Sequence, residues 1–180
     1  MNGTRTMRTS RIARVAAGLV AAALSVSLTG CNPDEYVVAT IAPTQGNTAT
    51  GEVRFYKVEG GVRVVARLEG LAPGPHGFHL HEKGDCSAPD AMSAGAHYNP
   101  GGAPHGAPQA DATHRHAGDL GNVEAGADGK ATVDRVDPLL VYENLAGLAV
   151  LVHANADDLT SQPAGNAGPR VGCGVIAKKA

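Results

Sequence analysis

The stretch that decides the fold begins at Gly77-Phe78-His79-Leu80-His81-Glu82 and continues to Gly118-Asp119. Seven of the eight histidines of the chain lie between His76 and His116. Imidazole is a common ligand for zinc, copper, iron and nickel. A histidine-rich surface loop, or histidines that make ordinary hydrogen bonds, is the alternative interpretation. So many histidines in so short a window favour a metal site.

His79 and His81 form the first spacing. Residues two apart in a strand face the same side, so these rings project together while Phe78 and Leu80 face the core. The two rings are roughly 6.5 Å apart along the strand, close enough to share one ion. His153 closes another strand and reaches the same ion if that strand lies nearby. Three such imidazoles favour copper or zinc, although His-x-His alone is a weak signal.

The second spacing lies in, or at the end of, a segment without periodicity from Lys83 to Gly118, where repeated proline and glycine exclude regular structure. An irregular loop of that length inside a compact domain is unusual, and ligation of metal at several points would order it. Three histidine nitrogens and one carboxylate oxygen complete a closed tetrahedral shell, which suits structural zinc. The expected ligands are His97, His105, His116 and Asp119.

Elsewhere the sequence predicts short strands and no helix of convincing length. Period-two alternation with β-branched residues indicates strands at Tyr36–Ile41, Gly51–Lys57, Val62–Leu68, His76–Glu82, Asp119–Val123, Lys130–Val136, Gly147–His153 and Arg170–Ala177. Glu59-Gly60-Gly61 and Asp128-Gly129 each indicate a hairpin. A second long loop runs from Ala154 to Pro169. Regularly spaced short strands with almost no helix predict an all-β antiparallel sandwich or barrel.

The first thirty residues are expected to be a targeting segment. A basic lead is followed by a small, apolar run over residues 15–28, shorter than the about 20 residues of a membrane span. The run ends in Leu28-Thr29-Gly30-Cys31, which resembles the lipobox of bacterial lipoproteins. That resemblance implies cleavage before Cys31 and lipid on it; an ordinary signal peptide with a stray cysteine is the alternative. Several acyl chains would anchor the protein firmly.

These features predict a signal peptide over residues 1–30, a lipid-anchored tether over 31–35 and one domain over 36–180. From Cys31 onward, eleven Lys and Arg face seventeen Asp and Glu, a formal net charge of −6. No basic stripe remains, so nucleic acid is not an expected partner. Export favours disulfides, and Cys86 and Cys173 are left to pair; two free buried thiols are the alternative. Closing so long a loop would stabilise the fold by roughly 4–5 kcal/mol in the chain-entropy model.

Four stretches resemble, in order, motifs of the copper–zinc superoxide dismutases of bacterial lipoprotein or periplasmic type. They are Gly77–Glu82, Gly95–Pro100, His116–Asn122 and Gly165–Val175. The resemblance covers essentially the whole chain after the tether. It implies an eight-stranded Greek-key sandwich or barrel with two long functional loops, and it implies the same Cys86–Cys173 disulfide.

The resemblance also implies two metals that share one ring. Copper would be held by His79, His81, His97 and His153, and zinc by His97, His105, His116 and Asp119. His97 would then bridge the two ions. Arg170 would anchor the substrate anion beside the copper. Asp157 would link a copper ligand to a zinc ligand by accepting their outer N–H groups, His76 would brace the scaffold, and His114 would be a solvated loop residue.

The implied activity is dismutation of superoxide to dioxygen and hydrogen peroxide, protecting the cell envelope from a lipid anchor that faces the periplasm or the exterior. A lipid-anchored protein that buffers or delivers copper and zinc is the alternative. Arg170 favours the enzyme, because storage needs no anion anchor. The expected partners are superoxide and the membrane, and a homodimer stays open. The segment between Leu159 and Arg170 carries no charged residue, so the sequence leaves open how the anion is steered.

Overall fold

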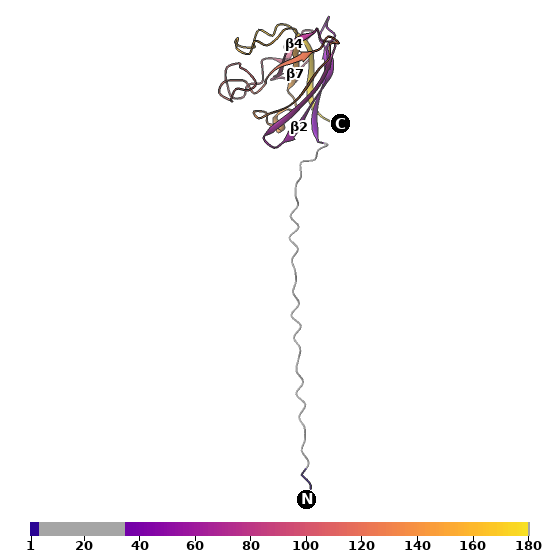
Figure 1. Ribbon diagram of the computed structural model, residues 1–180, viewed down its shortest axis with the longest axis vertical. Coiled ribbons are helices and arrows are strands. Elements are labelled where there is room, and N and C mark those ends of the chain that lie inside the picture. Colours follow the sequence, from indigo (N-terminus) through magenta and orange to yellow (C-terminus); the bar gives the residue numbers. More distant parts are fainter. Residues whose placement is uncertain (4–34, 180) are drawn as a thin grey trace. The chain divides into compact units, whose positions relative to one another are not determined.

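The computed structural model describes residues 1–3 and 35–179 of the chain (Figure 1). The predicted lipidation site Cys31, most of the tether and all but three residues of the predicted signal peptide lie outside the described residues. No helix among the described residues is long and apolar enough to cross a membrane.

Eight strands form the domain, each close to a run that the alternation predicts. They are β1 (Tyr36–Pro43), β2 (Thr50–Val58), β3 (Gly61–Glu69), β4 (Gly74–His81), β5 (Asp119–Ala125), β6 (Ala131–Asp137), β7 (Ala149–His153) and β8 (Arg170–Lys178). The described residues contain no α-helix; two short 3-10 turns, η1 (Met92–Ala94) and η2 (Tyr142–Asn144), lie in the loops. The prediction of an all-β antiparallel domain is confirmed.

The strands pair in the order β5-β4-β7-β8-β1-β2-β3-β6, in a sheet that curls into a nearly closed barrel. β2 and β3 form the hairpin predicted at Glu59-Gly60-Gly61. Two further pairings, β3 with β6 and β4 with β7, join strands that are distant in the chain. These crossovers are typical of Greek-key connections. They bring β4 and β7, which carry three of the predicted metal ligands, side by side.

The turn at Asp128-Gly129 forms, but the hairpin predicted from it is wrong. Gly129 has a φ of 72° and its N–H donates to the carbonyl of Gly126 at 2.9 Å. Beyond the turn, β5 pairs with β4 and β6 pairs with β3, so these two strands are opposite edges of the sheet. The dipeptide specifies a chain reversal, whereas packing of the strand faces decides which strands pair.

The barrel interior is packed with the inward-facing residues of each strand. Phe78 and Leu80 of β4 point into this core and are fully buried, as predicted. His79 and His81 point to the opposite face of β4, yet they are only 0% and 1% exposed. They are buried because the loops 82–118 and 154–169 cover that face; for example, the Tyr98 N–H donates to the Leu80 carbonyl at 2.8 Å. The histidines therefore lie between a rigid sheet and two loops.

A disulfide joins Cys86, in the first long loop, to Cys173 of β8, so the predicted pairing is confirmed. Around it lies a small apolar cluster that includes Ala91, Ala94 and Leu151. This cluster packs the middle of the loop against the outer face of the sheet. The loop is therefore fixed by covalent and apolar contacts as well as by any metal that it holds.

Candidate metal centre

The first group of converging side chains contains the four predicted copper ligands. His79 and His81 come from β4, and His153 is the last residue of β7. His97 reaches them from the loop, where it forms an isolated β-bridge with His81. One nitrogen from each of the four rings lies within 4.8 Å of the others. Residues up to 74 positions apart are thus gathered at one point by the sheet and one loop contact.

The second group contains the four predicted zinc ligands, His97, His105, His116 and Asp119, again with ligand atoms within 4.8 Å of one another. Asp119 Oδ1 is the centre of the group. It lies 2.8 Å from His97 Nδ1, 3.0 Å from His105 Nδ1 and 3.0 Å from His116 Nδ1. All four residues are buried. Three imidazoles and one carboxylate in such a closed arrangement form the donor set typical of structural zinc.

The buried nitrogens without hydrogen-bond partners show whether these groups fit metal ions. In the first group they are His79 Nδ1, His81 Nε2, His97 Nε2 and His153 Nε2. Each ring satisfies its other nitrogen: His81 Nδ1, for example, lies 2.9 Å from the Gly95 carbonyl, and His153 Nδ1 lies 3.0 Å from the Gly168 carbonyl. A buried polar atom without a partner is costly, so four of them facing one another mark a place for a cation. The donor set fits copper.

His97 belongs to both groups. Its Nε2 faces the first group without a hydrogen-bond partner, while its Nδ1 contacts Asp119 in the second. Its ring centroid lies 4.2 Å from that of His79 and 5.4 Å from those of both His105 and His116. The two candidate ion sites therefore share this ring, one at each nitrogen.

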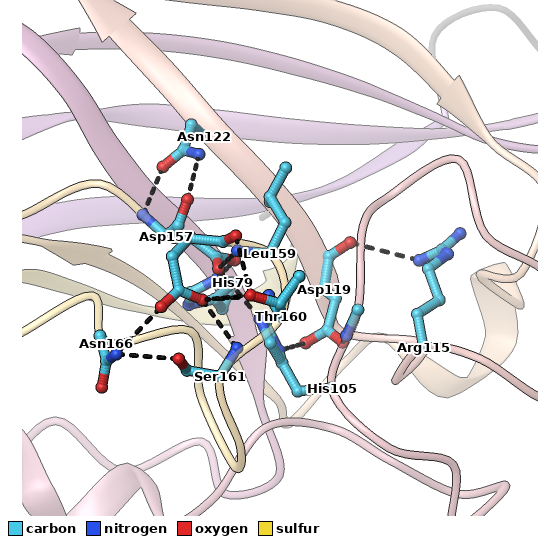
Figure 2. Close-up of polar contacts among 12 residues, drawn as sticks. His79, His105, Arg115, Asp119, Asn122, Asp157, Leu159, Thr160, Ser161 and Asn166 are labelled. Atoms are coloured by element: carbon cyan, nitrogen blue, oxygen red, sulfur yellow. Dashed lines mark hydrogen bonds and ion pairs between the residues drawn. The ribbon is translucent and has the colours of Figure 1, made fainter.

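Asp157 connects the two groups from behind (Figure 2). Its Oδ2 lies 2.8 Å from His79 Nε2, and its Oδ1 lies 2.9 Å from His105 Nε2. These are the outer nitrogens of one ring from each group, so each N–H donates to the carboxylate and the opposite nitrogen is left for an ion. Such contacts fix the tautomer and orientation of ligating imidazoles.

Burial keeps three rings of the first group neutral. It lowers the pKa of His79 to about 4, of His81 to about 2 and of His153 to about 3, although the hydrogen bonds of each ring oppose the shift. An imidazole binds a metal through the lone pair of its neutral form. These rings are therefore ready to bind an ion throughout the neutral pH range.

The second group has the opposite charge balance. Burial disfavours charge on His105, but hydrogen bonds with Asp119 and Asp157 outweigh it and raise its pKa to about 9. Burial likewise disfavours charge on Asp119, but hydrogen bonds from His105 and His97 hold its pKa well below the usual range. Without an ion, a proton on His105 therefore supplies the positive charge that this carboxylate requires.

Three residues that the sequence reasoning did not assign hold Asp157 and His105 in place. Asn122 of β5 makes two hydrogen bonds with the backbone of Asp157, at 2.7 and 2.9 Å. Gln162 makes two with the backbone of His105, at 2.8 and 2.9 Å. Gly165, at φ 64°, leaves the space that Asp157 occupies: a Cβ there would lie 1.8 Å from its Oδ1. Asn122 and Gly165 lie inside the quoted motifs, whereas nothing in the sequence singles out Gln162.

Arg115 is a large, fully buried side chain beside the second group that the sequence did not point to. It is 1% exposed, and its Nη2 lies 2.7 Å from Asp137 Oδ1 at the end of β6. Its other nitrogens donate to the carbonyls of Ala110, His116 and Asp119, at 3.1–3.3 Å. Two of these carbonyls belong to members of the second group. An arginine between two histidines in a polar loop gave no signal that it would be buried.

A cleft of about 1090 Å³ opens beside the first group and is lined by His81, His97 and His153. Arg170, at the start of β8, lines the same cleft. Its guanidinium donates to the carbonyls of Ala91 and Gly95, at 2.6 and 2.7 Å, which fixes its position. The first group is thus accessible from solvent next to a fixed cation.

The carboxylates of Glu82 and Asp90 also line the cleft, and among the described residues that line it Arg170 is the one Lys or Arg. Burial lowers the pKa of Arg170, and the charge of Asp90 opposes this shift. The cleft therefore places two carboxylates near a single guanidinium.

The remaining histidines lie outside both groups. His76 Nδ1 lies 2.7 Å from the His153 carbonyl and its Nε2 lies 2.8 Å from the Ala72 carbonyl, so the ring joins the start of β4 to the end of β7. His114 is exposed in the loop and contacts Asp111 at 2.9 Å. These positions agree with a bracing role for His76 and a solvated one for His114.

The eight-stranded Greek-key barrel and the two histidine groups that share one ring are the features of a β-barrel protein with two adjacent metal sites. The model of the copper/zinc superoxide dismutase family matches residues 49–176 of the sequence. The chain belongs to the copper/zinc superoxide dismutase family.

Among solved structures, the crystal structure of the clock protein EA4 is similar to this chain. The two share 39% sequence identity, with a TM-score of 0.69, over 79% of this chain and 93% of that one. The similarity therefore extends over nearly the whole of that protein.

Proposed function

We propose that the domain converts two superoxide anions and two protons into dioxygen and hydrogen peroxide. The observation that carries this proposal is the set of four unpartnered, buried nitrogens that face one another at the bottom of a cleft beside a fixed guanidinium. Membership of the family supports the same reaction. A cation site alone would suit storage, whereas Arg170 adds a group that binds an anion.

His79, His81, His97 and His153 would hold copper, and His97, His105, His116 and Asp119 would hold zinc. Copper supplies the change of valence by which one superoxide loses an electron and another gains it, and zinc, which has one useful valence, keeps the second group closed. Asp157 would hold the rings of His79 and His105 in the tautomers that leave their Nδ1 atoms free for an ion.

His97 is the residue that can move a proton within the site. Its Nε2 faces the first group without a hydrogen-bond partner, so this atom would hold a proton between the two halves of the reaction. Because the His97 side chain lines the cleft, this proton would pass to the reduced oxygen species before that species leaves. Nδ1 stays in the closed group, so the ring keeps its orientation throughout the cycle.

Arg170 would bind the anion for each half of the reaction. Its guanidinium stays charged at any working pH, and its two carbonyl contacts hold it at the wall of the cleft. The bound superoxide would thereby lie beside the first group, which converts a random encounter into a positioned one.

We further propose that the protein acts at the cell envelope, attached to a membrane through lipid on Cys31. The support is the sequence alone: a basic lead, a short apolar run and the Leu28-Thr29-Gly30-Cys31 tetrapeptide. The Cys86–Cys173 disulfide agrees with an oxidising compartment.

Purified protein loaded with copper and zinc would test the reaction. Superoxide consumption should be fast, metal analysis should give one copper and one zinc per chain, and the His153→Ala variant should lose copper and activity but retain zinc. Full occupancy of both metals with no consumption of superoxide would contradict the proposal and favour the buffering or delivery protein.

Mass spectrometry of protein isolated from membranes would show whether Cys31 carries acyl chains.

A further inference from the structure

A row of outward-facing side chains crosses four strands at the end of the barrel where β1 begins. Residues directly opposite each other on paired strands point to the same side of the sheet. The register aligns Tyr36 with Tyr56, Tyr56 with Arg63, and Arg63 with Val136. We call these four residues the Tyr36 row. They point away from the core, and Val136 is 50% exposed.

Cations surround the aromatic half of the row. The rings of Tyr36 and Tyr56 have centroids 5.2 Å apart. The guanidinium carbon of Arg54 lies 5.0 Å from the centroid of Tyr36, and Lys179 Nζ lies 4.9 Å from it. Tyrosines with polar tips, beside cations and an exposed apolar side chain, are the residue types that gather where proteins meet phospholipid headgroups.

The ion pairs on this face do not prevent such a contact. Arg63 pairs with Asp134 at 2.6 Å, and Arg54 pairs with Glu52 at 2.5 Å, with all four side chains between 38% and 55% exposed. Exposed pairs of this kind contribute little to stability, so a lipid phosphate can replace the carboxylate at little cost. Glu59 lies in the turn at the same end and carries a negative charge, so this end of the barrel is not a uniformly basic surface. The proposed contact therefore depends on the residues of the row.

The length of the tether places the row near a membrane. Tyr36 follows Cys31 by five residues, which span at most about 17 Å when fully extended. Lipid on Cys31 would therefore keep the start of β1 within that distance of the headgroups. Lys178 of β8 lies opposite Val37, so the C-terminal end lies at this end of the barrel too (Figure 1).

The metal cleft lies at the other end of the same strands. β1 has eight residues, a length of about 27 Å, and it is followed directly by Thr44, which lines the cleft. β8 runs antiparallel to β1 and starts at Arg170, which also lines the cleft. A surface in contact with the Tyr36 row is therefore separated from the cleft by the length of the barrel.

We propose that the Tyr36 row rests on the phospholipid surface and that the cleft faces away from the membrane. This orientation rests on the lipid anchor proposed above and not on the chemistry of the site. It leaves the cleft open to anions that diffuse in the aqueous phase.

The chain contains no tryptophan, so a single substituted tryptophan gives an unambiguous fluorescence signal. Tyr36→Trp places the reporter in the row, and Met92→Trp places it at the rim of the cleft, where Met92 is 61% exposed. Lipidated protein carrying either reporter is reconstituted in vesicles of phosphatidylcholine and phosphatidylglycerol with a nitroxide quencher on the headgroup. We expect quenching to reduce the emission of Tyr36→Trp by at least half and to leave that of Met92→Trp nearly unchanged.

A second substitution tests whether the row holds this orientation. Tyr56→Ser together with Arg63→Gln, added to Tyr36→Trp, should reduce quenching toward the value for Met92→Trp, while circular dichroism shows that the strands are retained. Equal quenching of both single reporters would overturn the proposal, because the barrel would then tumble freely on its tether. Doubled molecular size that these substitutions abolish would assign the row to a dimer contact instead. A Cys31 without acyl chains would remove the anchor and overturn the orientation, and superoxide consumption would be unaffected by either result.

Discussion

Arg115 and Asp137 form an ion pair of 2.7 Å between two side chains that are almost entirely buried. One comes from the loop that carries the second metal group and the other from the end of β6. The pair therefore attaches the loop to the barrel wall, and Arg115 also binds the carbonyls of His116 and Asp119. The position of the second group depends on this contact.

We expect Arg115→Met to lower both stability and zinc retention. Removing one partner of a buried ion pair typically costs about 3–5 kcal/mol, because the other charge is left without compensation. Chemical unfolding of the metal-free protein measures the loss, and metal analysis after dialysis against a weak chelator measures zinc. The double variant Arg115→Met/Asp137→Asn should recover part of the stability; a double variant as unstable as the single one would contradict this account.

Gly165→Ala should disrupt the link between the two groups. The new Cβ would lie 1.8 Å from Asp157 Oδ1 and 2.7 Å from His105 Nε2, so the carboxylate would have to move. We expect copper and zinc to dissociate faster during dialysis. Gly102→Ala is the matched control, because Gly102 has nearly the same φ, 65°, and nothing lies within 4 Å of its Cβ position. It should cost only the about 1–2 kcal/mol of the left-handed backbone. Similar metal loss in both variants would show that backbone strain, and not the clash, is responsible.

The metal-free protein should lose stability as the pH falls below about 6.5. Burial lowers the folded-state pKa of His79, His81 and His153 to about 4, 2 and 3, so in this range the unfolded chain binds protons that the folded chain does not. Each group contributes at most about 1.4 kcal/mol per pH unit. The pKa of His105, raised to about 9, has the opposite effect: its stabilisation is complete below pH 6.5 and is lost as the pH rises toward 9.

Urea unfolding between pH 5 and pH 9 would measure this profile. We expect the free energy of unfolding to be greatest near pH 6.5 and lower by at least about 2 kcal/mol at pH 5. His153→Gln should flatten the acid side, because it removes one of the three rings whose pKa burial lowers. A stability that is constant between pH 5 and pH 6.5 would show that these rings are not held neutral.

Arg170→Ala should reduce the rate of superoxide consumption at least tenfold while both metals stay bound, because the guanidinium lines the cleft and belongs to neither group. Azide titration followed by the copper absorption band would read anion binding separately and should show weaker binding. Loss of metal together with activity would assign Arg170 a structural role instead, through its contacts with Ala91 and Gly95.

Asp90→Asn should increase the rate of anion capture. The carboxylate lies in the cleft with Arg170 and opposes the approach of an anion, so its removal should raise kcat/KM about twofold at low salt, with a smaller gain once the Debye length falls to about 8 Å. Glu124→Gln changes the net charge equally at an exposed position on β5 and is the control. Equal effects of the two variants would show that net charge, and not the charge of the cleft, governs capture.

The strands and the clustering of the histidines were predictable because both depend on local patterns. Alternation in β4 placed Phe78 and Leu80 in the core and His79 and His81 on the other face. The strand that pairs with β5 was not predictable from Asp128-Gly129. A turn dipeptide specifies that the chain reverses direction, but it does not specify which strands form hydrogen bonds with each other. Arg115 and Gln162 were missed for a related reason: their partners are 22 and 57 residues away, and no spacing encodes such contacts.

Because the ring of His97 belongs to both groups, binding of the two ions should be thermodynamically coupled. An ion bound at one nitrogen fixes the orientation of the ring. The second ion then binds with a smaller loss of conformational entropy, so occupancy of one site should raise the affinity of the other. Linkage requires this cooperativity to be reciprocal: the factor by which zinc tightens copper equals the factor by which copper tightens zinc. A metal-delivery protein that transfers one ion would therefore bind the remaining ion more weakly. In an enzyme that keeps both ions, the same coupling strengthens the binding of each.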